Sequence, residues 1–307
     1  MQPQSDPNCP LCKVISGEYP SKTIYEDDKI LCALDINPAT KGHVILIPKQ
    51  HFAIMPVIPP DVFKHMSRVA IQVSKALRGR MMSNKNTIFV ANGGVAGQQS
   101  SHFLMHIIPS DKLKNFEIES IEEKDDAVYE ALKKNLTIMM MNHSKREQIN
   151  LGFVETEYLV ENDELIAKIP DRISAKGHIQ INAKNKLNLA SVEDFFYLAS
   201  YSATASFEFL SAHGSNILIN ESDDELSAHV VPRFTGDGLN FMWSPNKFDD
   251  LVMDNLQKSI SFGTVGLVLK DPEKKIKFDC LDSLDQIKPS VSTSSSSNIK
   301  QNLFDKI

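Results

Sequence analysis

Two histidines lie four residues apart in the run SHFLMHIIP at 101–109, which follows a glycine-rich segment. Alternation of side chains along a strand would place His102, Leu104 and His106 on one face of this run. The preceding segment, NGGVAGQ at 92–98, could bring backbone N–H groups close to phosphate oxygens, although a tight turn alone would also account for its glycines. Its position before the histidines favours a site for phosphate groups.

Two cysteines near the start of the sequence have the spacing of metal ligands. Cys9 and Cys12 form the motif CPLC, and in a reducing compartment this spacing indicates metal or redox chemistry instead of a structural disulfide. Two thiolates completed by two imidazoles would suit tetrahedral zinc. Cys32 and Cys280 are isolated and carry no such signal.

An internal repeat sets the order of the strands and helices on which these histidines and cysteines lie. Segment 30–49, ILCALDINPATKGHVILIPK, is similar to segment 165–184, LIAKIPDRISAKGHIQINAK. Each runs from an apolar strand through a turn containing aspartate to Lys-Gly-His, which ends at His43 or His178, and then into a second strand. Turns between short alternating strands favour antiparallel pairing.

The same succession of elements follows each copy of this hairpin. Apolar residues at three- and four-residue spacing predict helices over 62–77 and 192–210, with Asp61 and Ser191 as candidate N-caps. Each helix leads to a strand that ends in asparagine, a further strand and a final helix. The predicted strands are 88–92 and 101–109 in the first copy, and 216–220 and 226–234 in the second.

The fold class predicted from this pattern is α+β, with two tandem units that each combine an antiparallel sheet with a long helix. Unit one should cover 8–143 and unit two 150–262, joined by the polar stretch 142–150. The serine-rich segment at 286–307 has the composition of a flexible tail.

Composition excludes several classes of protein. Of the 307 residues, 42% are hydrophobic, which is enough to build cores and argues against global disorder. The formal charge of −6 gives no reason to expect nucleic-acid or membrane binding through bulk charge. Apolar runs such as 44–47 and 265–269 fall far short of the roughly 20 residues that cross a bilayer. The start lacks the features of a secretory signal, so a cytoplasmic location is expected.

Taken in order, CPLC, LDINPATKGHVILIPKQH, NGGVAGQ and His-x-x-x-His-Ile-Ile-Pro resemble the histidine triad family over nearly all of unit one. Unit two is similar in a degraded form, with KGH and AHVVPRFTGDGLNF. The tandem also resembles, in architecture, galactose-1-phosphate uridylyltransferase and dinucleoside-polyphosphate phosphorylase. The resemblance implies binding of nucleoside phosphates, and cleavage or transfer of nucleotidyl groups through a covalent nucleotidyl-histidine.

The nucleophile of the family is missing from both units. Its signature is His-x-His-x-His, in which the middle histidine attacks phosphorus, and the aligned positions are Leu104 in unit one and Ser227 in unit two. Leucine has no lone pair to offer, and serine needs an adjacent base to become a nucleophile. His229 lies two residues after Ser227, but a small packing residue is the more frequent role of a hydroxyl at such a position.

The resemblance carries further roles onto individual residues of unit one. Asp35 matches the aspartate that holds the ribose hydroxyls, Asn92 and Gln98 match phosphate-contacting amides, and the outer histidines orient the phosphate. In unit two the glycine-rich loop is absent and Asp171 lies one position away from the aligned aspartate. The implied nucleotide-binding residues are Asp35, His43, Asn92, Gly97, Gln98 and His106, with His178, Ser227, His229 and Arg233 as remnants in unit two.

One zinc ion per chain is implied as a structural cofactor. His51 and His102 match the third and fourth zinc ligands of the family and would complete the site of Cys9 and Cys12. Unit two has no CxxC, and Lys186 and Glu225 stand at the positions of the two histidines, so no second zinc is expected.

Three hypotheses about function remain open at this point. The first is a nucleoside-phosphate-binding protein that has lost catalysis, with a nucleoside mono- or polyphosphate or a nucleotidyl conjugate as partner. The second is an active nucleotidyl hydrolase or transferase with an unusual nucleophile, such as Ser227 or water, and the third is a zinc-stabilised interaction module. Related single-unit proteins pair as dimers, so the two units should pack as an internal pseudo-dimer; a further homodimer stays open.

Overall fold

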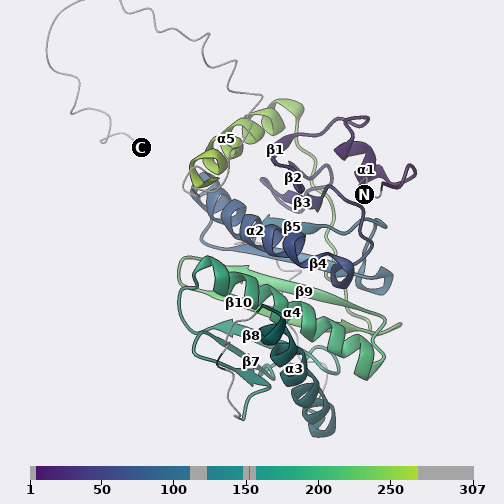
Figure 1. Cartoon of the computed structure of the whole chain (residues 1–307). Coiled ribbons are helices and arrows are strands. Elements are labelled where there is room, and N and C mark those ends of the chain that lie inside the picture. The colour runs from purple at the N-terminus through teal and green to yellow at the C-terminus, as the bar shows by residue number, and fades with distance from the viewer. Residues whose placement is uncertain (1–4, 111–122, 148–151, 153–156, 269–307) are drawn as a thin grey trace, which may run out of the picture. The chain divides into compact units, whose positions relative to one another are not determined.

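The computed structural model describes residues 5–110, 123–147, 152 and 157–268, and these residues contain ten strands joined in one sheet (Figure 1). Every pair of neighbouring strands is antiparallel, in the order β1-β2-β3-β5-β4-β9-β10-β8-β7-β6. The α+β class is therefore confirmed. The strands of the first half are β1 Thr23–Glu26, β2 Ile30–Leu34, β3 Val44–Pro48, β4 Asn86–Asn92 and β5 Met105–Pro109. Those of the second half are β6 Val160–Glu161, β7 Leu165–Lys168, β8 Ile179–Ala183, β9 Gly214–Glu221 and β10 Leu226–Arg233.

The two repeats meet edge to edge through β4 and β9. This pairing runs from Asn86 opposite Glu221 to Asn92 opposite Ser215, so the edge strand of each half becomes a central strand of the whole sheet. A sheet edge left open in either half would expose unpaired backbone groups, and this pairing satisfies them.

Two long helices cover one face of the sheet. Helix α2 (Pro60–Met81) packs on β3, β4 and β5, and α4 (Leu189–Leu210) packs on β8, β9 and β10. The predicted helices at 62–77 and 192–210 are confirmed, but both predicted N-caps are wrong. Pro59 and Pro60 begin α2, where a missing N–H costs nothing, and Asn188 caps α4 by accepting from the N–H groups of Ala190 and Ser191.

The short helix α1 (Pro10–Ile15) lies on the other face of the sheet, in the first half. Its apolar side chains pack against Leu31, Ala33 and Ile47 of β2 and β3. Two single turns of 3-10 helix, η1 (Met55–Val57) and η2 (Gly94–Ala96), flank the site described below.

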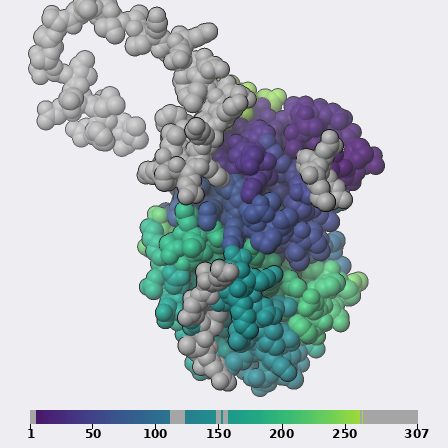
Figure 2. Space-filling view, viewed as in Figure 1, coloured from purple at the N-terminus to yellow at the C-terminus, as the bar shows by residue number. Residues whose placement is uncertain are grey.

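The last helix of each repeat packs on the other repeat. Helix α3 (Asp126–Glu147) lies along α4, and the Tyr129 hydroxyl donates to the carbonyl of His178. Helix α5 (Asp250–Val268) lies against α2 and β1, where Gln257 donates to the carbonyl of Thr23 (Figure 1). In Figure 2 the yellow-green surface of this last described helix adjoins the purple and blue surface of the first half.

Four sequence predictions need correction or stay open. Strand β5 begins at Met105, not at residue 101, so His102 does not share a strand face with Leu104 and His106. The polar stretch at 142–150 is helical as far as Glu147. The bounds 8–143 and 150–262 remain a proposal about the sequence repeat, and the tail at 286–307 lies outside the described residues.

Among the helices that the structure describes, none has the length and apolar character needed to cross a lipid bilayer.

A buried ion pair joins α2 to β9 across the junction of the two halves. The Arg78 guanidinium donates to both carboxylate oxygens of Glu221 at 3.0 Å, and the Ser74 hydroxyl donates to Glu221 at 2.6 Å. The side chains of Arg78 and Glu221 are only 8% and 3% exposed. Removing one member would leave the other charge buried without its partner.

We therefore expect Arg78→Met to lower the free energy of unfolding by about 3–5 kcal/mol in urea denaturation. The exposed pair of Lys29 and Asp61 provides the control, because Lys29→Met should cost less than about 1 kcal/mol. Adding Glu221→Gln to Arg78→Met should recover part of the loss. Equal losses for Arg78→Met and Lys29→Met would show that the ion pair does not hold the halves together.

Candidate functional site

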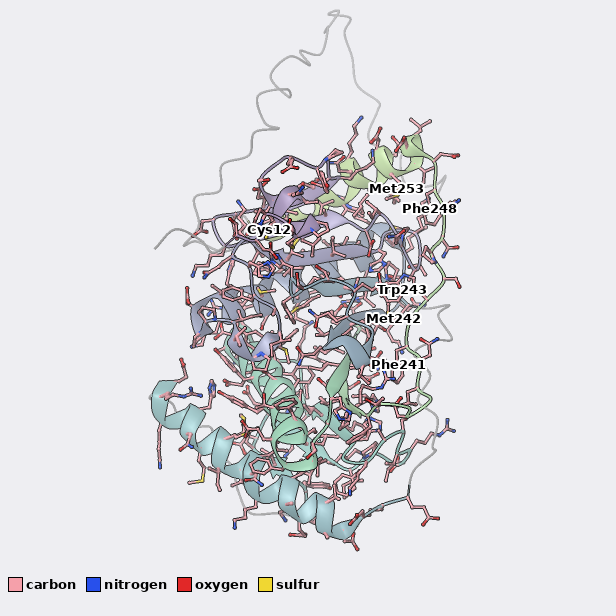
Figure 3. All side chains as sticks on the ribbon, turned by 90° about the vertical axis from the view of Figure 1, so that its right-hand side faces the viewer. Cys12, Phe241, Met242, Trp243, Phe248 and Met253 are labelled. Carbon is pink, nitrogen blue, oxygen red and sulfur yellow. The ribbon has the colours of Figure 1, made fainter. Side chains whose placement is uncertain are left out.

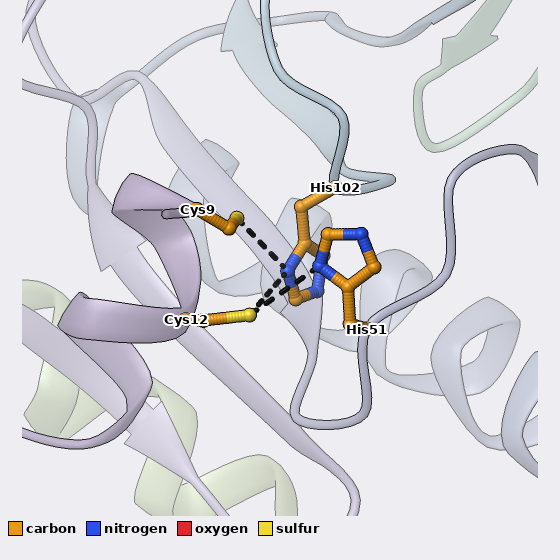
Figure 4. A group of neighbouring side chains, drawn as sticks. All are labelled: Cys9, Cys12, His51 and His102. Atoms are coloured by element: carbon orange, nitrogen blue, oxygen red, sulfur yellow. Dashed lines mark hydrogen bonds between the residues drawn. The ribbon is translucent and has the colours of Figure 1, made fainter. Parts of the chain in front are cut away.

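Four side chains from three separate segments converge on one point beside α1 (Figure 4). Cys9 precedes α1 and Cys12 lies within it, while His51 follows β3 and His102 precedes β5. The Cys12 sulfur lies 3.3 Å from His51 Nδ1 and 3.5 Å from His102 Nδ1, and the Cys9 sulfur lies 3.7 Å from His102 Nδ1. Zn–S bonds of about 2.3 Å and Zn–N bonds of about 2.0–2.1 Å, at tetrahedral angles, separate sulfur from nitrogen by about 3.5 Å. The spacing of the four donors therefore fits tetrahedral zinc.

The backbone fixes which nitrogen of His102 faces the thiols. His102 Nε2 lies 2.8 Å from the carbonyl oxygen of Pro48, to which it can only donate, so Nδ1 carries the lone pair. Burial lowers the pKa of His102 to about 4, which keeps the ring neutral. A neutral ring held by a carbonyl on its far side is the usual arrangement of a metal-binding histidine.

A second pair of histidines forms a hydrogen-bond chain with one direction. The backbone N–H of Ala39 donates to His43 Nδ1 at 3.0 Å, so in the neutral ring the proton is on Nε2. His43 Nε2 then donates to His106 Nδ1 at 3.0 Å, which leaves the proton of neutral His106 on Nε2. Burial and the neighbouring His106 lower the pKa of His43 to about 3. His106 is therefore oriented to present an N–H donor.

Asp35 lies beside this pair. Its Oδ2 is 3.5 Å from His43 Nε2 and 3.4 Å from His106 Nδ1, and its Oδ1 accepts from the N–H of Asn37 at 2.7 Å. Burial acts to raise the pKa of Asp35, but the neighbouring imidazoles of His106 and His43 and the N–H of Asn37 outweigh it and lower the pKa. The three donors lie close enough together for a metal ion, but His43 Nε2 already carries the proton of the chain, so this cluster does not fit a metal site.

A cavity of about 550 Å³ opens beside Asp35 and His106. Leu104 lines it next to His106, at the position where the family's nucleophile is expected. Gly97 and Gln98 line it from the loop after η2, and Ile45 lines it from β3. His43 is buried behind His106 and is not among the lining residues.

The two amides of the glycine-rich loop hold the segment that leads into η1. Asn92 Oδ1 accepts from the N–H of Met55 at 3.1 Å, and Gln98 Nε2 donates to the carbonyl of Ala53 at 2.7 Å. Gln98 Oε1 accepts from the N–H of Gly93 at 2.7 Å, which closes the loop on itself. These bonds give the predicted phosphate-contacting amides a structural task.

Sequence reasoning missed one wall of the cavity, which comes from the second half. Figure 3 shows Phe241, Met242 and Trp243 on the extended segment that leads to α5. The Trp243 ring stands edge-on to both histidines, with centroids 5.1 Å from His43 and 4.9 Å from His106, and its Nε1 donates to the carbonyl of Asn37 at 2.9 Å. The sequence has one tryptophan, and it lies in an aperiodic Gly/Asn/Pro-rich segment. This was the signal that could have indicated a residue of the site.

Gly97 lies where the segment that carries Met242 and Trp243 packs against the glycine-rich loop. Its φ of +89° suits glycine, and a Cβ there would lie 2.8 Å from the Met242 sulfur. The backbone conformation at position 97 therefore favours glycine, and any larger residue there would force the Met242 side chain to move.

In unit two the paired histidines have the same arrangement. The N–H of Ser174 donates to His178 Nδ1 at 3.2 Å, and His178 Nε2 lies 3.0 Å from His229 Nδ1. Ser227 is 1% exposed, and its hydroxyl donates to Glu225 at 2.5 Å. Ser227 lies away from the unit-one cavity, because three strands of the sheet separate β10 from β3.

Arg233 is not the anion contact that we predicted for unit two. Its guanidinium is buried and donates to the carboxylate of Asp237, to Asn216 Oδ1 and to the carbonyl of Leu239. These four hydrogen bonds engage most of the guanidinium and fix the start of the segment that reaches Trp243.

Comparison with known proteins agrees with these features. The sequence profile of the HIT domain matches residues 16–113. The adenylylsulfatase HINT3 of Arabidopsis thaliana is 40% identical over 102 residues, which are 33% of this chain and 52% of that protein, so the match spans about half the length of this relative. An uncharacterized HIT-like protein of Methanocaldococcus jannaschii is 39% identical over 101 residues, 33% of this chain and 78% of its own length.

Two further similarities concern a named activity and a solved structure. The adenosine 5′-monophosphoramidase HNT1 of Candida albicans is 34% identical over 112 residues, 34% of this chain and 72% of that protein. A zinc-bound histidine triad family protein from Mycobacterium smegmatis is 34% identical, with a TM-score of 0.34 over 35% of this chain and 80% of that one. From the four ordered motifs and the similarity over most of a relative's length, this chain belongs to the histidine triad (HIT) family.

Proposed function

We propose that this protein binds a nucleoside phosphate in the cavity of its first half and turns it over slowly or not at all. The observation that carries the proposal is the hydrogen-bond chain from Ala39 through His43 to His106, which ends beside Leu104 in the cavity. An N–H donor suits a phosphate oxygen, and a leucine in the place of the nucleophile cannot form a covalent intermediate.

The residues around the cavity supply complementary contacts for such a ligand. Asp35, ionised because its pKa is lowered, would accept from the ribose hydroxyls. His106 would donate from Nε2 to a phosphate oxygen, and the backbone of the loop ending at Gln98 would approach the same phosphate. Trp243 and Met242 would exclude water from one side. The names of two relatives, an adenylylsulfatase and an adenosine 5′-monophosphoramidase, make an adenosine 5′-phosphate the first ligand to test.

We also propose a structural zinc ion held by Cys9, Cys12, His51 and His102. The donor spacing and the carbonyl behind His102 support this assignment. Bound there, the metal would join α1 to the loops before β5 and after β3. Thiolate ligands of this kind suit a reducing compartment, so we retain the cytoplasm as the proposed location.

An active nucleotidyl enzyme is the second candidate function. The observation in its favour is the 2.5 Å hydrogen bond from Ser227 to Glu225, because a carboxylate can activate a hydroxyl. Against it, Ser227 is buried and does not line the cavity beside His106. We therefore rank this function below binding without turnover.

Protein purified without chelator should contain about one zinc ion per chain by elemental analysis. Removing the metal should unfold the region around α1, because structural zinc in small peptides contributes on the order of 10–16 kcal/mol of apparent binding free energy. Cys9→Ser and His102→Ala should lower the zinc content, whereas Cys32→Ser, at a cysteine outside the cluster, should not. Metal-free protein of unchanged stability would rule out the zinc site.

Titration calorimetry with adenosine monophosphate should give one binding site per chain. His106→Ala with Asn92→Ala should abolish measurable binding, because a hydrogen bond to a charged group is worth about 1.5–3 kcal/mol and the loop would lose its anchor. His229→Ala is the matched control in unit two and should leave the affinity nearly unchanged. Two equal sites per chain would contradict the asymmetry between the units.

The third test concerns turnover of adenosine 5′-monophosphoramidate. Loss of the nucleophile of a cooperating set costs on the order of a millionfold in rate, so the natural protein should hydrolyse this substrate negligibly. Leu104→His should form a nucleotidyl adduct detectable by mass spectrometry, and adding His106→Ala should remove it. Turnover by the natural protein at roughly 1 s⁻¹ or faster would overturn the binding-only proposal, and its loss in Ser227→Ala would favour the second candidate.

A further inference from the structure

A second cavity, of about 360 Å³, lies where η1 and α2 meet α3 and α4. Its size falls at the lower end of ligand pockets in proteins. None of the residues that line the nucleotide cavity or form the zinc cluster lines it, although Met55, which does, is bonded to Asn92. One wall is apolar and comes mainly from Met55, Ile58 and Phe63, all buried, with Met139 of α3 beside them. This wall excludes water from a ligand without directing its orientation.

The side of the cavity formed by α3 and α4 carries aromatic rings. Tyr197 and Tyr201 of α4 are stacked with centroids 5.8 Å apart and an interplanar angle of 24°. The His143 ring of α3 lies 4.3 Å from the Tyr197 ring. The Phe63 ring meets the Tyr197 ring edge-on with centroids 5.0 Å apart, so the aromatic lining is continuous with the apolar wall. A flat apolar lining of this kind favours a planar ligand, because stacking and burial then act together.

A hydrogen-bond chain with one direction runs along this wall. Arg146 Nη2 donates to the Tyr201 hydroxyl oxygen at 2.6 Å, which leaves the hydroxyl proton for His143 Nδ1 at 3.3 Å. His143 Nε2 lies 3.4 Å from Asp194, which accepts the remaining proton. Burial raises the pKa of Tyr201, so the phenol stays protonated and the chain keeps its direction.

The charges around the cavity favour an anionic ligand at its mouth. Glu147 forms an ion pair with Lys64, and Asp194 accepts from His143 and is not among the residues that line the cavity. Arg146 lines the cavity and is exposed, and only one of its five N–H groups is needed for Tyr201. A guanidinium in this position can bind a carboxylate through two parallel hydrogen bonds.

We propose that this cavity is a binding site for a small planar aromatic anion, with the ring against Tyr197 and Tyr201 and the carboxylate on Arg146. The site is independent of the nucleotide cavity.

The test uses 2-naphthoate as the probe and the full chain, with titration calorimetry as the measurement. We expect a dissociation constant of about 1 mM or tighter, the range that an efficient ligand of this size reaches. Replacing the probe by neutral 2-naphthalenemethanol, or the protein by Arg146→Gln, removes the charge-assisted pair. Each change should therefore weaken binding about tenfold. Lys145→Gln, a change of the neighbouring exposed cation on α3, is the matched control and should leave the affinity unchanged.

Filling the cavity should block the probe. Ser200→Phe should remove binding while leaving affinity for adenosine monophosphate intact, and Thr204→Trp provides a second filling variant if the first fails to fold. No binding of 2-naphthoate to the natural protein would overturn the proposal. Binding that survives both filling variants, or that is displaced by adenosine monophosphate, would place the probe elsewhere and would overturn it equally.

Discussion

The antiparallel pairing of β4 with β9 determines how the other elements of both repeats are placed. It makes one sheet from two repeats and brings the segment after β10 to the cavity of the first half. The exchange of α3 and α5 between the repeats, and the buried pair of Arg78 and Glu221, follow from the same junction. The repeats are therefore parts of one folding unit, and the second contributes to the site of the first.

A chain of hydrogen bonds then determines the chemistry of that site. An amide N–H can only donate, so the contact from Ala39 sets the tautomer of His43, and His43 sets that of His106. The same logic at His102, from the carbonyl of Pro48, turns a lone pair toward the thiols. Two histidines near one another in sequence are thus prepared for different tasks by single backbone groups: one for donation, one for proposed metal binding. We propose that the N–H donor of His106 still binds phosphate although the nucleophile is absent, so the protein binds without turnover.

Local sequence patterns predicted the parts of this arrangement that depend on local spacing. The hairpins, the long helices and the clustering of Cys9 with Cys12 follow from periodicity and short motifs, and the resemblance supplied His51 and His102 as partners. Non-local contacts escaped prediction. Asn216 on the neighbouring strand binds the Arg233 guanidinium together with Asp237, only four residues away, and no motif signalled either bond. Trp243 reaches the histidines only because β4 pairs with β9. The start of β5 was misplaced because His102 turns away toward the cysteines.

The decisive measurement is a crystal structure of the full chain soaked with adenosine monophosphate. The account predicts one nucleotide per chain, with a phosphate oxygen within hydrogen-bond distance of His106 Nε2, ribose hydroxyls on Asp35, and Trp243 against the ligand. Leu104 should contact the phosphate group without any covalent bond. Density for the nucleotide at His229 alone, or no density beside His106 at a concentration that saturates binding in solution, would contradict it.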